Sequence, residues 1–130
     1  MDNIGIRKDL SASYDATLAA IPGVLREEGF GVLTEIDVAK TLKQKIDVDF
    51  RRYTILGACN PTFAHRALGV QLEAGVMLPC NVIVWERDGG GATVLVVDPM
   101  QTIAAEAGGE LEKIAREVRA KLERVVARLT

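Results

Sequence analysis

The sequence has little of what builds a membrane anchor, a secreted disulfide framework or a zinc site. It contains no run of about 18 apolar residues, so we expect no membrane-spanning helix. Residues 1–10 lack the apolar segment of a secretory signal, and the chain has only two cysteines and one histidine. Two cysteines without a signal peptide are expected to stay reduced, which makes the cytoplasm the expected compartment.

Neither sign of charge dominates, and the common catalytic signatures are missing. Sixteen Lys and Arg residues against eighteen Asp and Glu residues give a net charge of −2. Because general nucleic-acid binders are normally basic, we expect no nucleic-acid partner. The glycine run Gly89–Gly91 joins two predicted strands and has no phosphate-loop spacing. A Ser-His-Asp signature, an HExxH motif and an EF-hand loop are also absent from the sequence.

The hydrophobic pattern predicts one α+β domain that spans residues 1–130. Apolar residues make up 48% of the chain, enough for one buried core. Their periodicity predicts the order β-α-β-α-β-α-β-β-α, with strands at 4–10, 31–36, 53–59, 79–87 and 92–98. The opening strand-helix-strand order favours a parallel crossover. We therefore expect a two-layer sandwich, with one mixed five-stranded sheet covered by helices.

Three local patterns make this prediction specific. Gly29 suits the left-handed position after the first helix, and Phe30 suits the apolar contact beyond it. Asp37 is expected to cap a short helix whose residues Val38, Leu42 and Ile46 face inward. The last helix, residues 110–129, carries an apolar stripe that is expected to pack on the sheet. That stripe consists of Leu111, Ile114, Ala115, Val118, Leu122, Val125, Val126 and Leu129.

Two Cys-Asn pairs, one at the end of a predicted strand and one at the start of another, mark the candidate site. Cys59-Asn60 ends the third strand, and Cys80-Asn81 begins the fourth. The pairs would meet at one edge of the sheet if these strands are antiparallel neighbours. Glu35, near the end of the second strand, would join that edge if the second and third strands are parallel. Asn60 followed by proline is also a good helix cap, and both amides can serve turns instead of ligands.

The thiols allow several chemistries, which the sequence leaves open. A helix start beside Cys59 would lower its pKa and favour the thiolate, whereas burial would make it a small inert hydrophobe. Cys59 and Cys80 could form a working dithiol if their Cα atoms lie within about 7 Å. With His65 they could supply three ligands of a zinc site, but the spacing matches no zinc motif. We therefore expect no metal and no cofactor.

Several segments together resemble the DUF302 family, whose function is unknown. The resemblance lies in GFGVLTEIDV, KTLKQKIDVDFRRYTILGACNP, LPCNVIVWERDGG and VVDP, from about Gly29 to Pro99. The residues that match the paired family motif are Cys59, Asn60, Pro61, Pro79, Cys80 and Asn81. The resemblance implies a small two-layer α+β domain that forms a homodimer. It implies no activity.

The leading hypothesis is a domain that binds a small ligand or a partner at the Cys-Asn edge. The candidate ligand-binding residues are Glu35, Cys59, Asn60, His65, Cys80 and Asn81. One alternative is a thiol-based redox enzyme or sulfur carrier, with Cys59 and Cys80 as the catalytic candidates. The other is a purely structural or interaction module in which both motifs serve the fold.

Overall fold

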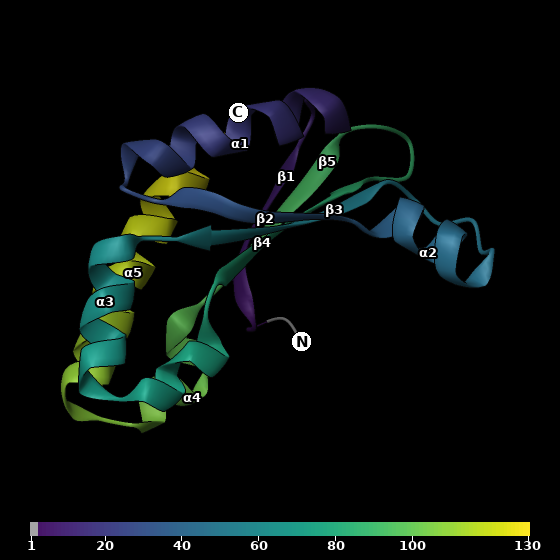
Figure 1. Ribbon diagram of the computed structural model, residues 1–130. Helices are drawn as coiled ribbons and strands as arrows, with labels where there is room; N and C mark the ends of the chain where they lie inside the picture. Colours follow the sequence, from purple (N-terminus) through teal and green to yellow (C-terminus); the bar gives the residue numbers. More distant parts are fainter. Residues whose placement is uncertain (1–2) are drawn as a thin grey trace.

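Five strands form one sheet whose every pairing is antiparallel, in the order β1-β5-β4-β3-β2. The computed structural model describes residues 3–130, apart from the side chain of Ile103 (Figure 1). The strands are β1 (Gly5–Leu10), β2 (Gly31–Asp37), β3 (Tyr53–Cys59), β4 (Cys80–Glu86) and β5 (Ala92–Val97). The helices are α1 (Tyr14–Glu27), α2 (Val38–Ile46), α3 (Pro61–Val70), η1 (Leu72–Met77), η2 (Pro99–Gln101), α4 (Ile103–Glu106) and α5 (Gly109–Arg128). The predicted α+β class and element order are therefore confirmed, with η1, η2 and α4 added in the connections.

The prediction of a mixed sheet with a parallel crossover is wrong in its strand directions. β1 and β2 point the same way, but they lie at opposite edges of the sheet and do not pair. The chain crosses the whole sheet through α1, and β1 pairs instead with the distant β5, from Gly5↔Val97 to Leu10↔Ala92. A strand-helix-strand order fixes the handedness of a crossover between neighbours, but it does not say whether the two strands are neighbours.

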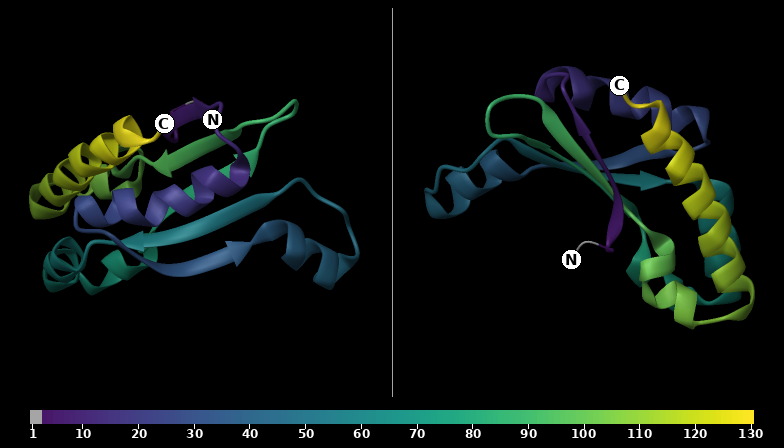
Figure 2. Two further views of the ribbon diagram at one scale, coloured as in Figure 1. Left: turned by 90° about the horizontal axis from the view of Figure 1, so that it is seen from above. Right: turned by 180° about the vertical axis from the view of Figure 1, so that it is seen from behind.

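One face of the sheet packs against α1 and α5 and forms the core. Val82, Val84, Val94 and Val96 point to this face and are 0–1% exposed. Helices α1 and α5 contact each other across it, as the view from above shows (Figure 2). All eight residues of the predicted α5 stripe are buried there, so the placement of that stripe in the core is confirmed.

The ends of α1 and α5 are fixed by capping contacts. Gly29 has φ +85°, and the backbone N–H of Phe30 donates to Leu25 O at 3.0 Å, while the Phe30 side chain is buried. This is the cap predicted from the sequence. At the other end of the core, Lys8 Nζ on β1 donates to Leu129 O at 2.5 Å, beside the last turn of α5. A cation there complements the negative end of the helix dipole.

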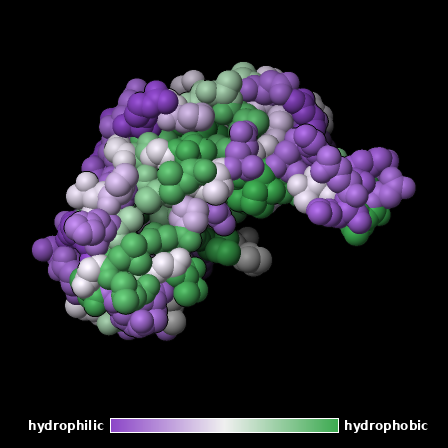
Figure 3. All heavy atoms as spheres, in the orientation of Figure 1, coloured by the Kyte–Doolittle hydropathy of each residue, from purple (hydrophilic) through white to green (hydrophobic). Residues whose placement is uncertain are grey.

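Helix α2 projects from the body and has no buried residue. Asp37 caps it as predicted, accepting from Lys40 N at 3.0 Å. The expectation that Val38, Leu42 and Ile46 face a core is wrong, since Ile46 is 63% exposed and the other two are only half-buried. The reason is topological, because β2 is an edge strand and the chain leaves the body at its end (Figures 1 and 3).

Candidate functional site

The two cysteines meet where β3 ends and β4 begins. Ala58 and Cys80 are direct cross-strand partners, and Cys59 is the next residue of β3. The antiparallel pairing of β3 and β4 thus meets the condition under which the two Cys-Asn pairs share an edge. Both thiols are free and partly buried.

No helix in residues 3–130 is long and apolar enough to cross a membrane.

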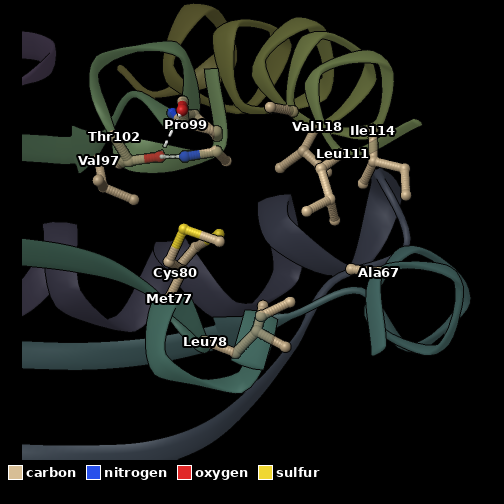
Figure 4. Close-up of a pocket in the computed structure, with 13 residues that line it drawn as sticks. Ala67, Met77, Leu78, Cys80, Val97, Pro99, Thr102, Leu111, Ile114 and Val118 are labelled. Atoms are coloured by element: carbon tan, nitrogen blue, oxygen red, sulfur yellow. Dashed lines mark hydrogen bonds between the residues drawn. The ribbon is translucent and has the colours of Figure 1, made fainter. Parts of the chain in front are cut away.

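An apolar cavity of about 90 Å³ lies beside Cys80, between η1, η2 and α5. The Cys80 sulfur points into it, with Val118, Leu111 and Ile114 of α5 on the opposite wall (Figure 4). Thr102 supplies the hydroxyl of the lining, but its Oγ1 already donates to Pro99 O at 2.6 Å and accepts from Ala104 N at 3.3 Å. The cavity therefore presents a surface suited to an apolar group.

A second, smaller cavity of about 50 Å³ lies beside Cys80 and Cys59. It is walled by Phe30 and Phe63 near Cys59. The two cavities share five lining residues, namely Ala67, Leu78, Cys80, Ile114 and Val118. The two cavities are therefore neighbours, and Cys80 and Ala67 line both of them.

The surroundings of both thiols oppose ionisation. Burial raises the pKa of the Cys80 thiol to about 11, and the neighbouring Cys59 adds to the rise. Burial also raises the pKa of Cys59. The start of α3 directly after Cys59 made a lowered pKa one possibility from the sequence. Burial shifts the pKa in the opposite direction, because apolar contacts cost the thiolate its hydration.

The two asparagines take different places. Asn60 stands at the cap position of α3, but its side chain does not cap that helix. Its Nδ2 instead donates to Glu28 O at 3.3 Å, which ties the start of α3 to the end of α1. Asn81 is exposed, and as successive strand residues point to opposite faces, it lies on the face away from Cys80.

Two other candidate residues lie outside this site. Glu35 is paired with Leu56, three residues before Cys59, because β2 runs antiparallel to β3. It lines a separate polar hollow with Tyr14 and Arg52. The expectation that Glu35 reaches the Cys-Asn edge depended on parallel strands and is wrong. His65 is exposed on α3 and is not part of either cavity lining.

A metal-binding arrangement is not found in the described part of the chain. Within residues 3–130, no group of three or more His, Cys, Asp or Glu residues is placed to hold a metal ion, which includes Cys59, His65 and Cys80. The linings of the two cavities are largely apolar, and the thiols contribute polarisable surface to them.

The helical wall of the cavity is the part that sequence reasoning missed. Met77 of η1 and Leu111 of α5 line it, yet in the sequence they read as connection and core. One feature of the sequence could have indicated the cavity. Four small residues, Ala67, Ala74, Ala104 and Ala115, line the space from different elements and leave it unfilled.

Comparison with known proteins agrees with the resemblance found in the sequence. The profile described as "Domain of unknown function DUF302" matches residues 6–129. A crystal structure of an uncharacterized conserved DUF302 protein from Bacillus stearothermophilus superposes with a TM-score of 0.89. The two sequences are 28% identical, and the match covers 98% of this chain and 99% of the other. No match was found among curated proteins.

Proposed function

This chain belongs to the DUF302 family, and from the site that its fold builds we propose that it binds a small apolar ligand beside Cys80. The observation that carries the proposal is a pair of neighbouring apolar cavities, of about 90 Å³ and about 50 Å³, at the Cys-Asn edge. Protein interiors are normally close-packed, with few voids larger than a water molecule. An apolar cavity of roughly 150 Å³ in another protein stays dry and takes up benzene, so the larger cavity of this chain, at about 90 Å³, suits a small apolar group.

Titration with 1-hexanol tests this proposal through the methionine methyl groups. Met77 lines the cavity, whereas Met100 is not in its lining, so the two provide a signal and an internal control. We expect the Met77 methyl resonance to shift in a saturable manner while that of Met100 stays in place. A ligand at ten times its Kd should also stabilise the fold by about 1.4 kcal/mol.

A cavity-filling variant makes the test specific. Ala67 lines both cavities, so Ala67→Leu should fill space beside Cys80 and abolish the saturable shift. Thr62→Leu, on the exposed side of the same helix, is the matched control and should leave binding intact. Failure of hexanol to move Met77, or undiminished binding by folded Ala67→Leu, would rule out the cavity as a ligand site.

The thiol enzyme is the weaker alternative. Catalytic cysteines act as thiolates, and burial raises the pKa of both thiols in this chain. The location that we propose is the cytoplasm, a reducing compartment in which Cys59 and Cys80 would stay as thiols.

A second copy of the chain is the protein partner that we propose. The segment that runs from within β2 through α2 to Phe50, here termed the arm (residues 33–50), contains five exposed large apolar residues. They are Leu33, Ile36, Ile46, Val48 and Phe50. The nine-residue helix within it is too short to be stable alone, so a contact that covers its apolar side would stabilise it.

The face of the sheet opposite α1 and α5, here termed the uncovered face, lies next to the arm and offers a surface that such a contact could use. Tyr53 and Trp85 stack there with ring centroids 5.8 Å apart, and Phe50 of the arm lies 6.3 Å from Tyr53. Pairing through the β2 edge is less favourable, because an irregularity between Val32 and Thr34 interrupts that strand. The proposed dimer therefore uses the arm and the uncovered face.

A further inference from the structure

Helix α3 supplies one wall of both cavities beside Cys80. Ala67 lines the larger cavity, and Phe63, Ala64 and Ala67 line the smaller one. The helix lies alongside α5 beyond the end of β3, and it packs mainly on α5 and η1 (Figure 1). Movement of α3 away from α5 would therefore open both cavities to solvent.

Few apolar contacts hold α3 in place. Among residues 61–70 only Ala67 is buried, and Phe63 and Leu68 are partly buried against the core. By contrast, α5 carries seven buried residues. Because the stabilisation from apolar burial scales with the area that is removed from water, α3 should separate from the body more readily than α5 does.

A single arginine ties the outer side of α3 to α5. Arg66 Nη1 donates to Glu117 Oε2 at 2.9 Å, and its Nη2 donates to Glu110 Oε1 at 2.8 Å. The same guanidinium lies 5.3 Å from the centre of the Phe63 ring. All three charged side chains of these ion pairs are partly exposed, so each pair contributes little to stability and can break at small cost.

The two ends of α3 are held differently. At its start, Asn60 Nδ2 donates to Glu28 O at 3.3 Å, which ties this end to α1. At its far end, Gly69 and Val70 are exposed. Helix η1 follows directly and also has only one buried residue, Ala74. An outward movement should therefore pivot near Asn60 and be largest at the end of α3.

We propose that α3 is the gate of the apolar cavities, held closed by the ion pairs of Arg66 and opening away from α5 to let a ligand pass. This inference rests on the proposed function, since a gate acts only if the cavities take up a ligand. It adds the route of entry. It also assigns a role to Arg66, which lines neither cavity and would control the rate of ligand exchange without touching the ligand.

The exchange kinetics of 1-hexanol test the gate. Arg66→Gln removes both ion pairs and keeps a polar side chain on the helix surface. It should raise the association and dissociation rate constants together by about three- to tenfold and leave Kd within about twofold, because it destabilises the closed gate and not the bound ligand. Line-shape analysis of the Met77 methyl resonance during the titration gives both rates.

Arg116→Gln is the matched control. It removes the same charge from an ion pair that lies within α5, where Arg116 Nη2 contacts Glu112 Oε1 at 2.9 Å. Its exchange rates should equal those of the native protein. Added salt should speed exchange in the native protein and in Arg116→Gln, but not in Arg66→Gln, because salt screens the ion pairs of the gate.

The outcomes separate the gate from the proposed function. Saturable hexanol binding with equal exchange rates in the native protein and in folded Arg66→Gln would overturn the gate alone. A weaker affinity of Arg66→Gln at an unchanged association rate would also overturn it, since the arginine would then stabilise only the bound state. Absence of hexanol binding to the native protein would overturn the proposed function, and the gate with it.

Discussion

At the scale of single residues, Cys80 has the most consequential environment. Its sulfur faces an apolar cavity, and burial raises its pKa to about 11. At pH 7 only about one molecule in ten thousand would carry the thiolate at that pKa. This residue is therefore suited to contact with a ligand, and a neutral-pH nucleophile would need a different environment.

The raised pKa of Cys80 predicts a loss of stability at alkaline pH. The unfolded thiol ionises near pH 8.5 and the folded thiol near pH 11, so the stabilisation is complete below the first value and is lost as the pH rises toward the second. We expect the difference in unfolding free energy between the native protein and Cys80→Ala to shrink by about 2–3 kcal/mol between pH 8 and 11.5. Urea titrations across this range measure it.

The comparison between variants is needed because other groups titrate in the same range. Burial also raises the pKa values of Tyr14 and Tyr53, which contribute equally to both proteins and cancel in the difference. Parallel stability curves for native protein and Cys80→Ala would show that the thiol is not buried in solution. Rapid reaction of Cys80 in the native protein with a disulfide reagent at pH 7 would also show that this thiol is not buried.

The two residues Gly29 and Asn60 show which caps the sequence can predict. Gly29 was predictable because its positive φ is a property of the local backbone. Asn60 also has a strong local preference for capping, yet its amide donates to Glu28 O instead. That partner comes from another helix, 32 positions away in the sequence, and competition from such a contact is invisible to local reasoning.

At the scale of elements, α5 is the helix on which the core depends. Its stripe was predictable from the sequence because a 3.6-residue apolar period requires no knowledge of the partner surface. The structure adds two ion pairs between α3 and α5, in which Arg66 contacts Glu110 at 2.8 Å and Glu117 at 2.9 Å. These contacts hold the helical wall of the cavity.

A truncation in the α5 stripe should therefore be costly. Leu122 is fully buried, so Leu122→Ala should lower the free energy of unfolding by about 2–5 kcal/mol. Glu123→Ala, one residue further along the helix and exposed, is the matched control and should cost at most about 0.5 kcal/mol. Chemical denaturation measures both. A cost below about 1 kcal/mol for Leu122→Ala would contradict the packing of α5 on the sheet.

Helix α2 shows the opposite limit of prediction from sequence. Its boundaries and its Asp37 cap followed from local pattern, but its apolar residues were assigned to a core that does not exist beside it. Periodicity identifies an apolar side and cannot identify what covers that side. Within residues 3–130 no residue of α2 is buried, and the proposed dimer would supply a covering surface.

At the scale of the whole molecule, the arm is where the proposed dimer can be tested. Ile46→Glu places a charge on an apolar residue that is 63% exposed in the monomer, so folding should be unaffected. If the arm packs against a second copy, the buried carboxylate should weaken association at least tenfold, because its desolvation costs several kcal/mol. Analytical ultracentrifugation over a concentration series measures the dissociation constant.

A second exposed site supplies the control for the dimer. Leu72→Glu lies on η1 and changes a residue that is 79% exposed, so it should leave association unchanged. A native protein that sediments as a monomer at high micromolar concentration would refute the dimer. Equal weakening by both variants would show that the effect is not specific to the arm.

Topology is the level at which sequence reasoning was least complete. The strands and helices were found individually, and the meeting of Cys59 with Cys80 followed once β3 and β4 were known to be antiparallel. The order of strands was not predictable, because pairings such as Gly5 with Val97 join segments that share no local signal. The cavity was missed for the same reason, since its walls come from η1, η2, α3 and α5.

The pairing of β1 with β5 has a consequence for biosynthesis. As the ribosome releases the chain, β1 emerges early and finds no partner until Val97 has followed it. The contact from Lys8 to Leu129 O closes later still, when nearly the whole chain has emerged. Docking of the earliest segment is thus a late event, and nascent chains stalled before β5 should leave β1 open to proteases.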